Sequence, residues 1–215
     1  MTWALVISLL AIGSGIAPSH AADASRPLVA RALLALRGGD AHGANALAAR
    51  AVAADDRSAL AHAVLARTAL ALGDGITAEA ELARARDRGF APARMHQMVA
   101  HARLLQGDAE GALAEAKKAA PRYWVYGLRI QAAALVAQGN PGAAAEIMND
   151  AARRAPDDAI TWTDIGKLCR AVGDSVCAIE AATRAVALDG NNTDALLLRG
   201  QLVATQFGLS AALPW

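Results

Sequence analysis

Hydrophobic and polar positions alternate along the chain in blocks that recur at a nearly constant distance. Segments rich in Ala and Leu, with apolar residues three or four positions apart, are separated by a Gly-Asp or Gly-Asn pair. Such apolar spacing predicts amphipathic helices. Because Gly can end one helix in the left-handed conformation and Asp or Asn can cap the next, each period predicts one helix pair. The five residue pairs that separate the helices are Gly39-Asp40, Gly73-Asp74, Gly107-Asp108, Gly139-Asn140 and Gly173-Asp174. The distance between successive residue pairs is nearly constant and is slightly shorter only between the third and the fourth.

Small residues recur at matching places in the predicted helices, which indicates close helix–helix packing. On the first helix of each pair they are Ala32, Ala66, Ala100, Ala132 and Gly200. On the second helix they are Ala44, Ala78, Ala112, Ala144 and Ala212. A coiled coil needs an uninterrupted heptad pattern, and the Gly-Asp pairs interrupt it in every period.

Composition agrees with an all-α fold and excludes several classes of function. Hydrophobic residues make up 55% of the chain but aromatic residues only 4%, so Ala and Leu, which favour helices, dominate. The formal net charge of +1 is far from the basic excess typical of nucleic-acid-binding proteins. The sequence has no phosphate-binding glycine loop, dinucleotide fingerprint or His-Glu-x-x-His motif. We therefore expect no nucleic-acid partner, no cofactor and no enzymatic activity.

The repeat resembles the tetratricopeptide repeat family, whose unit is about 34 residues long. The fifth unit carries the clearest match, with a large residue, small residues and a turn glycine at the family positions Trp162, Ile165, Gly166, Cys169, Gly173, Ala178, Ile179 and Ala185. Other units depart from it, with His62 and His96 at the position of Trp162. A related helical-repeat family with longer units is the competing assignment. The resemblance implies a right-handed α-solenoid of antiparallel helix pairs over 25–215, with about five full repeats and a partial sixth.

The two ends of the chain suggest processing and truncation. The apolar run Ala4 to Ile16, followed by Ser19-His20-Ala21, predicts a signal peptide over 1–21, although no Lys or Arg precedes it. An uncleaved anchor is the alternative. We expect an exported bacterial protein, periplasmic or associated with the cell envelope, with no transmembrane span in the mature chain. The sixth unit stops partway through its second helix, which predicts a fragment of a longer protein; a short protein that docks this half-helix is the alternative.

Cys169 and Cys177 are the only cysteines, and they lie on opposite arms of one predicted helix–turn–helix. Two outcomes remain open, a disulfide formed after export or two buried thiols. The absence of a Cys-x-x-Cys motif argues against redox catalysis. His62 and His96 lie one repeat period apart and are predicted to be structural, because no carboxylate or thiol occurs at a supporting metal-ligand spacing.

The resemblance also indicates which first-helix residues face a concave groove. Most of the charged ones are basic, and the predicted partner-binding residues are Arg67, Arg94, His101, Arg129, Lys167 and Arg170. Leu60, Gln97, Leu104, Tyr126 and Thr163 share the same face. Such a groove suits a protein or peptide ligand with acidic side chains or a free carboxylate. The alternative is a solvated groove without a dedicated ligand.

Tyr123, Trp124 and Tyr126 form an aromatic cluster beside the shortened period. This cluster either fills space where the array changes its twist or stacks on a ligand. The leading functional hypothesis is a scaffold that binds a peptide or a protein surface without catalysis. The alternative hypothesis is the amino-terminal repeat region of a larger enzyme or of a polysaccharide-export or envelope-assembly protein.

Overall fold

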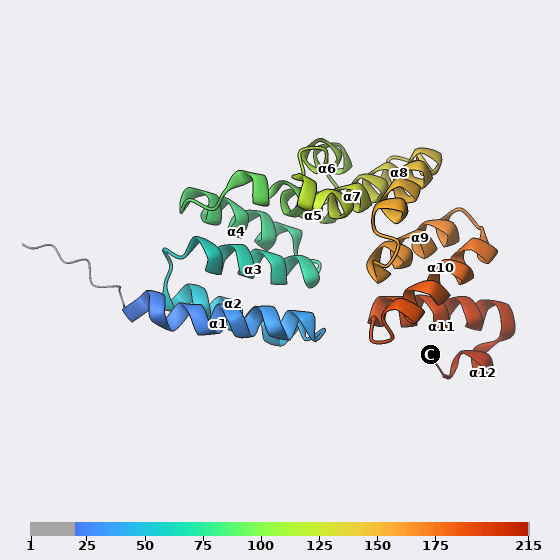
Figure 1. Cartoon of the computed structure of the whole chain (residues 1–215), viewed down its shortest axis with the longest axis horizontal. Helices are drawn as coiled ribbons and strands as arrows, with labels where there is room; N and C mark the ends of the chain where they lie inside the picture. Colours follow the sequence, from blue (N-terminus) through green and yellow to red (C-terminus); the bar gives the residue numbers. More distant parts are fainter. Residues whose placement is uncertain (1–19, 215) are drawn as a thin grey trace, which may run out of the picture.

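The computed structural model describes residues 20–214, which form helices without a β-strand (Figure 1). The predicted signal peptide, 1–21, lies outside the described residues except for its last two positions, which open α1. The long helices are α1 (His20–Arg37), α2 (Ala41–Ala54), α3 (Ala59–Ala71), α4 (Gly75–Asp87), α5 (His96–Leu105), α6 (Ala109–Ala116), α7 (Trp124–Ala137), α8 (Pro141–Arg154), α9 (Ala159–Ala171), α10 (Ser175–Leu188) and α11 (Thr193–Phe207). Within residues 20–214, no helix is long and apolar enough to cross a membrane.

The Gly-Asp and Gly-Asn pairs form the turns between the two helices of each pair, as predicted. Gly39, Gly73, Gly107, Gly139 and Gly173 all have φ between 75° and 83°, the left-handed region that an L side chain disfavours. The following Asp or Asn accepts a hydrogen bond from the backbone N–H three residues later, as Asp74 Oδ1 does from Thr77 at 2.9 Å. The same bond caps α2, α6, α8 and α10.

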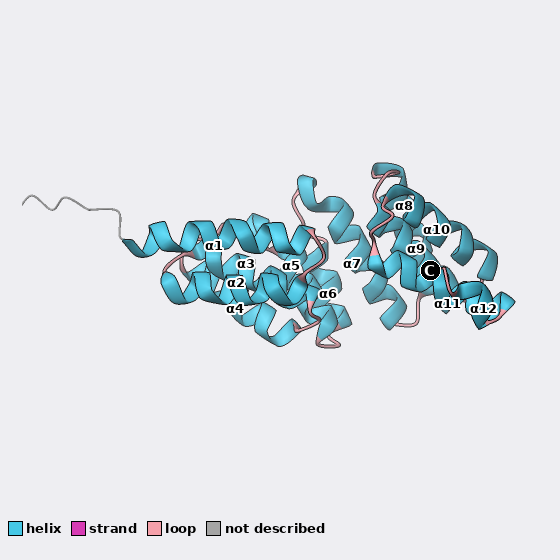
Figure 2. Ribbon diagram, turned by 90° about the horizontal axis from the view of Figure 1, so that it is seen from below, coloured by secondary structure: helices cyan, strands magenta, loops and turns pink. Residues whose placement is uncertain are grey.

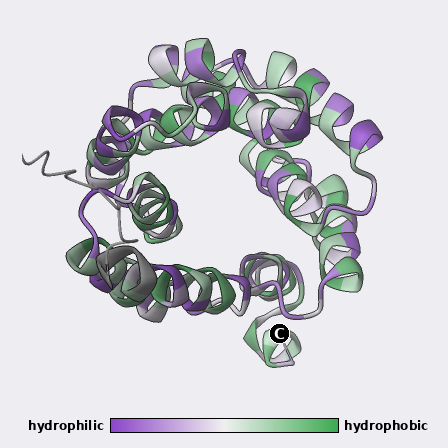
Figure 3. Cartoon of the chain, turned by 60° about the vertical axis from the view of Figure 1, so that its left-hand side comes forward, coloured by the Kyte–Doolittle hydropathy of each residue, from purple (hydrophilic) through white to green (hydrophobic). Residues whose placement is uncertain are grey.

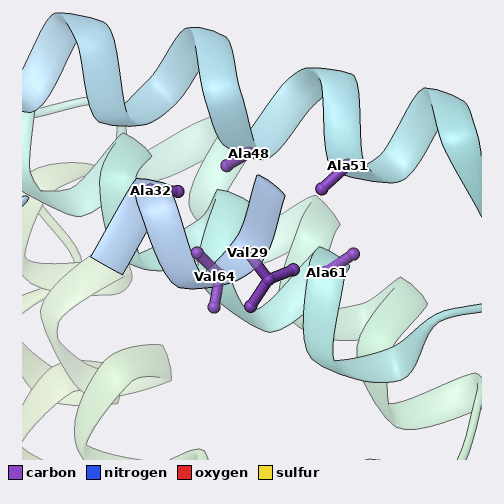
Figure 4. Packing of buried hydrophobic residues seen from close by; sticks show 6 residues of the cluster. All are labelled: Val29, Ala32, Ala48, Ala51, Ala61 and Val64. Carbon is purple, nitrogen blue, oxygen red and sulfur yellow. The ribbon is translucent and has the colours of Figure 1, made fainter. Parts of the chain in front are cut away.

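The core consists of small side chains between closely packed helices. Ala32, Ala66 and Ala100 on first helices and Ala44 and Ala78 on second helices are fully buried. Figure 4 shows one such cluster, in which Val29, Ala32, Ala48, Ala51, Ala61 and Val64 meet between α1, α2 and α3. Methyl groups at the contacts allow the helix axes to approach closely, and dispersion contacts then extend along the whole array.

Each second helix packs on its own partner and on the first helix of the next pair. The first helices α1, α3, α5, α7, α9 and α11 also contact one another in succession and line the inner side of a curved solenoid. Figure 1 shows the resulting curvature, with α1 and α11 toward the two ends of an arched array, and in Figure 3 the helices curve around a shared inner side. In Figure 2 the same helix pairs are seen along the array from below. Curvature therefore turns residues from separate repeats toward a shared inner space.

The shortened period reflects a short second helix. Helix α6 has eight residues, and a 3-10 turn, η2 (Pro121–Tyr123), leads into α7. A similar turn, η1 (Pro92–Arg94), precedes α5, so Pro92 and Pro121 each open a 3-10 turn before a first helix. At the other end, α12 (Leu209–Ala212) spans only four residues, and Leu209 and Leu213 are largely exposed.

Candidate functional site

A cavity of about 730 Å³ lies on the inner side of the solenoid, within the size range of protein ligand sites. Its walls come from α1, α3, η1, α5, η2 and α7, and the α8–α9 connection together with the first turn of α9 closes it through Ala155, Asp158 and Ile160. Four helix pairs and the start of a fifth thus contribute to one site.

Repeat register explains which side chains reach the cavity. Leu60, Arg94, Tyr126 and Ile160 occupy equivalent positions in four successive repeats, and all four line the cavity. Because successive first helices stack side by side, residues one period apart lie in a row along the concave face. This row combines two aliphatic residues, one aromatic residue and one cation.

Four of the six predicted groove residues line this cavity, namely Arg67, Arg94, His101 and Arg129. Lys167 and Arg170 lie on α9 beyond it, and both have partners of their own. Lys167 Nζ lies 2.7 Å from the Asp194 carboxylate, and the Arg170 guanidinium donates to Gln201. Leu104 and Thr163 from the same predicted face also lie outside the cavity; Thr163 is buried and donates to the Ala159 carbonyl.

The cavity walls carry more positive than negative charge. Three arginines line the cavity, against one carboxylate, Asp158. That carboxylate is engaged as the α9 N-cap, where it accepts hydrogen bonds from the Thr161 backbone and hydroxyl. Charge-assisted hydrogen bonds from Arg to carboxylates are among the stronger polar contacts in proteins.

The three cavity arginines differ in their surroundings. Arg129 Nε donates to Asp164 at 2.7 Å, so this cation is already paired. The Arg94 guanidinium lies 4.9 Å from the centre of the Phe90 ring, which holds it at the cavity wall. Arg67 is exposed, and within residues 20–214 no ion pair to it is found. Arg67 is therefore the cation most available to an anionic ligand.

A hydrogen-bonded aromatic pair lines the cavity. His101 Nδ1 and Tyr126 Oη are 2.7 Å apart, and the two rings meet edge to face with centres 5.8 Å apart. Burial lowers the pKa of the His101 imidazole, and the nearby charge of Arg129 lowers it further. Burial raises the pKa of Tyr126 to about 12. The neutral phenol therefore donates to the neutral imidazole.

The aromatic cluster beside the shortened period divides between two environments. Tyr123 and Tyr126 line the cavity, whereas Trp124 faces outward with its ring 5.0 Å from the Arg154 guanidinium. Both predicted roles, space filling and contact with a ligand, thus remain open for the two tyrosines. Phe90, which our sequence analysis did not single out, also lines the cavity.

His62 and His96 each contact a carboxylate on the second helix of their own repeat, a contact that the sequence did not predict. His62 Nδ1 lies 2.5 Å from Glu81 Oε2, and His96 Nδ1 lies 2.9 Å from Glu115 Oε2. Although burial alone raises the pKa of the Glu115 carboxyl, hydrogen bonds from Lys118 and His96 hold it below its usual value. The available sequence signal was the equal separation of histidine and glutamate in two successive repeats. Each pair joins the two helices of one repeat.

Cys169 and Cys177 are joined as a disulfide between the end of α9 and the start of α10, with their Cα atoms 5.8 Å apart. Both cysteines line a second cavity of about 370 Å³, whose other walls include Met148 and Ile165. No cluster of three or more His, Cys, Asp or Glu side chains suited to a metal ion occurs in the part of the chain that the structure describes.

No family model and no curated protein matches the sequence, but solved structures match the fold. One is a thermophilic tetratricopeptide repeat protein from Thermus thermophilus, with a TM-score of 0.70 and 18% identity over 84% of this chain and 99% of that one. Another is PilW, a widely conserved type IV pilus biogenesis factor, with a TM-score of 0.61 and 17% identity over 88% and 89% of the two chains. PilF of Pseudomonas aeruginosa gives a TM-score of 0.57 and 18% identity over 91% and 90%. The fold is therefore a tetratricopeptide-type α-solenoid.

Proposed function

We propose that this protein is an exported interaction scaffold that binds an acidic peptide, or an acidic segment of a protein, in its concave cavity. The observation that carries this proposal is the cavity itself, in which Arg67, Arg94 and Arg129 stand among apolar and aromatic walls. A ligand with carboxylates and apolar side chains matches both features. No covalent chemistry is part of the proposal.

Most of the cavity lining comes from packed helices, so little ordering accompanies binding. Preformed sites lose less conformational entropy when a ligand enters, which improves affinity for a given set of contacts. The walls come from several repeats, so the ligand gains several modest contacts at once. An extended segment would follow the row formed by Leu60, Arg94, Tyr126 and Ile160.

An envelope location is part of this proposal. The predicted signal peptide over 1–21 favours export, and the fold-level likeness to PilW, a type IV pilus biogenesis factor, is consistent with a role in envelope assembly. In the alternative form of the proposal, these repeats serve as the ligand-binding part of a larger envelope-assembly or polysaccharide-export protein.

Charge reversal at the cavity tests the proposed function. The probe is a dye-labelled hexapeptide in which Asp alternates with Leu, and its counterpart carries Lys in place of each Asp. Fluorescence anisotropy should show binding of the acidic probe only. Arg67→Glu should weaken that binding by about tenfold or more, because it replaces an attractive contact by a repulsive one.

The matched control is Arg50→Glu, which makes the same charge change on α2, away from the cavity. Its affinity for the acidic probe should equal that of the wild type. Equal binding of the Asp and Lys probes, or equal losses in the two variants, would contradict an acidic-ligand site in the cavity.

A further inference from the structure

Gln97 combines deep burial with an unsatisfied oxygen. It is the second residue of α5, lines the cavity and is 2% exposed. Its Nε2 donates to the Arg94 carbonyl at 2.8 Å, which assigns the other amide atom as the oxygen. Within residues 20–214, no hydrogen-bond partner of Gln97 Oε1 is found.

Buried carbonyl oxygens are almost always paired, because a carbonyl that loses water without gaining a donor destabilises the fold. Gln97 is an exception in an otherwise well-satisfied core. The only other unpaired buried side-chain atom among the described residues is Ser25 Oγ, on α1. Gln97 lines the cavity, so a rotation of its side chain would bring this acceptor to the cavity, where a molecule that enters supplies the donor.

Repeat register places Gln97 among cavity-lining positions. Its equivalents one period before and after are Ala63 and Arg129, and both line the same cavity. Ala63 cannot accept a side-chain hydrogen bond, and Arg129 is a donor that already pairs with Asp164. Among these three equivalent positions, Gln97 is therefore the one that offers a side-chain acceptor. It lies between the cations Arg67 and Arg129 on the neighbouring first helices.

We propose that Gln97 is a specificity-determining residue, whose Oε1 accepts a hydrogen bond from a main-chain N–H of the acidic peptide. This inference rests on the proposed function and names what the site recognises besides charge. Carboxylates of the ligand would pair with Arg67 and Arg94, while one peptide N–H would satisfy Gln97. Because Oε1 is buried in this conformation, its engagement requires the side chain to rotate toward the cavity.

The site would then select an extended peptide over other anions. A simple carboxylate or phosphate offers acceptors for the arginines but no donor for Gln97. A peptide offers both groups at a regular spacing along an extended chain. A water molecule is the competing partner for Oε1, and the experiment distinguishes the two.

A double-mutant cycle between protein and probe tests the assignment. The protein variants are wild type, Gln97→Met, and the control Gln131→Met on α7, which does not line the cavity. The probes are the alternating Asp-Leu hexapeptide and versions of it N-methylated at one peptide bond at a time. Met matches Gln in length but has no strong acceptor, and N-methylation removes one donor.

We expect N-methylation at one position to weaken binding to wild type by about fivefold, the size of one hydrogen bond. Gln97→Met should bind the unmodified probe about fivefold more weakly and lose nothing further on methylation at that position. Gln131→Met should behave as wild type. Thermal unfolding of Gln97→Met should show a protein about as stable as wild type, since removal of the unpaired oxygen offsets the loss of the Nε2 hydrogen bond to the Arg94 carbonyl.

Equal sensitivity of wild type and Gln97→Met to methylation at every position would overturn the assignment and leave water as the partner of Oε1. In that case the Asp-Leu probe still binds, and the proposed function stands. Failure of the unmodified probe to bind wild type would instead overturn the proposed function and this assignment together.

Discussion

Gly75 opens α4 where the following helix pair passes close to its backbone. A Cβ built at Gly75 would lie 2.5 Å from the Ala102 carbonyl oxygen and 2.8 Å from Leu105 Cβ. Neither atom belongs to the far end of a flexible side chain, so the helices themselves must separate to accept it. At Gly142, in the first turn of α8, a Cβ would meet nothing within 4 Å. The same residue type therefore has different roles at the two sites.

We predict that Gly75→Ala lowers the free energy of unfolding by about 1–3 kcal/mol, the usual cost of overpacking. Gly142→Ala should leave it unchanged or raise it by up to about 1 kcal/mol, because Ala restricts the unfolded chain and favours the helix. Urea unfolding followed by circular dichroism measures both values. Similar urea midpoints for the two variants would show that the close approach of the helices at Gly75 does not exclude a Cβ atom there.

His101 makes stability depend on pH in a defined direction. Burial and Arg129 hold its pKa below the ordinary value of 6.5, so between the two values the unfolded chain binds more protons than the folded one. The free energy of unfolding should therefore fall as pH drops below about 6.5. No contribution from His101 is expected above that pH, where the imidazole is neutral in both states.

His101→Gln should reduce this loss, because Gln can still accept from the Tyr126 hydroxyl but does not titrate. Comparing unfolding at pH 7.5 and 5.5 in both proteins isolates His101, since the other histidines are common to both. An NMR titration should place the His101 pKa below 6.5. Identical pH dependence in the two proteins would refute the stated role of burial.

Helices of this chain begin and end where local chemistry requires it, and for that reason they could be predicted. The left-handed glycine at Gly73 and the cap at Asp74 act within a few residues, so their effect is visible in the sequence itself. The His62–Glu81 contact instead links the two helices of one repeat. It depends on how the helices rotate against each other, and no local pattern specifies that rotation.

The disulfide adds a covalent link between α9 and α10. Cross-linking restricts the unfolded chain, and for a loop of this size the entropic estimate is about 2–3 kcal/mol. Cys169→Ser combined with Cys177→Ser should lower the free energy of unfolding by up to that amount. The mass of the wild-type protein purified under oxidising conditions should rise by about two hydrogens on reduction. An unchanged mass would mean two free thiols.

Across the whole molecule, repeat register predicted the inner face, but curvature decided which part of it forms a site. Arg67, Arg94, His101 and Arg129 meet in one cavity because the array bends around them. Lys167 and Arg170 have similar register but lie beyond the cavity, paired with α11. The pairing of Arg129 with Asp164 likewise joins two repeats. Curvature is a sum of small rotations between helices, which the pattern of apolar residues does not specify.

Hydrogen–deuterium exchange with and without the alternating Asp-Leu hexapeptide tests the central claim most directly, because it reports where on the solenoid the ligand acts. We expect slower exchange in α1, α3, α5 and α7 and around 155–160, which line the cavity, with little change in α2, α4 and α6. Protection confined to the second helices, or none with the probe at saturation, would contradict a binding site on the concave face.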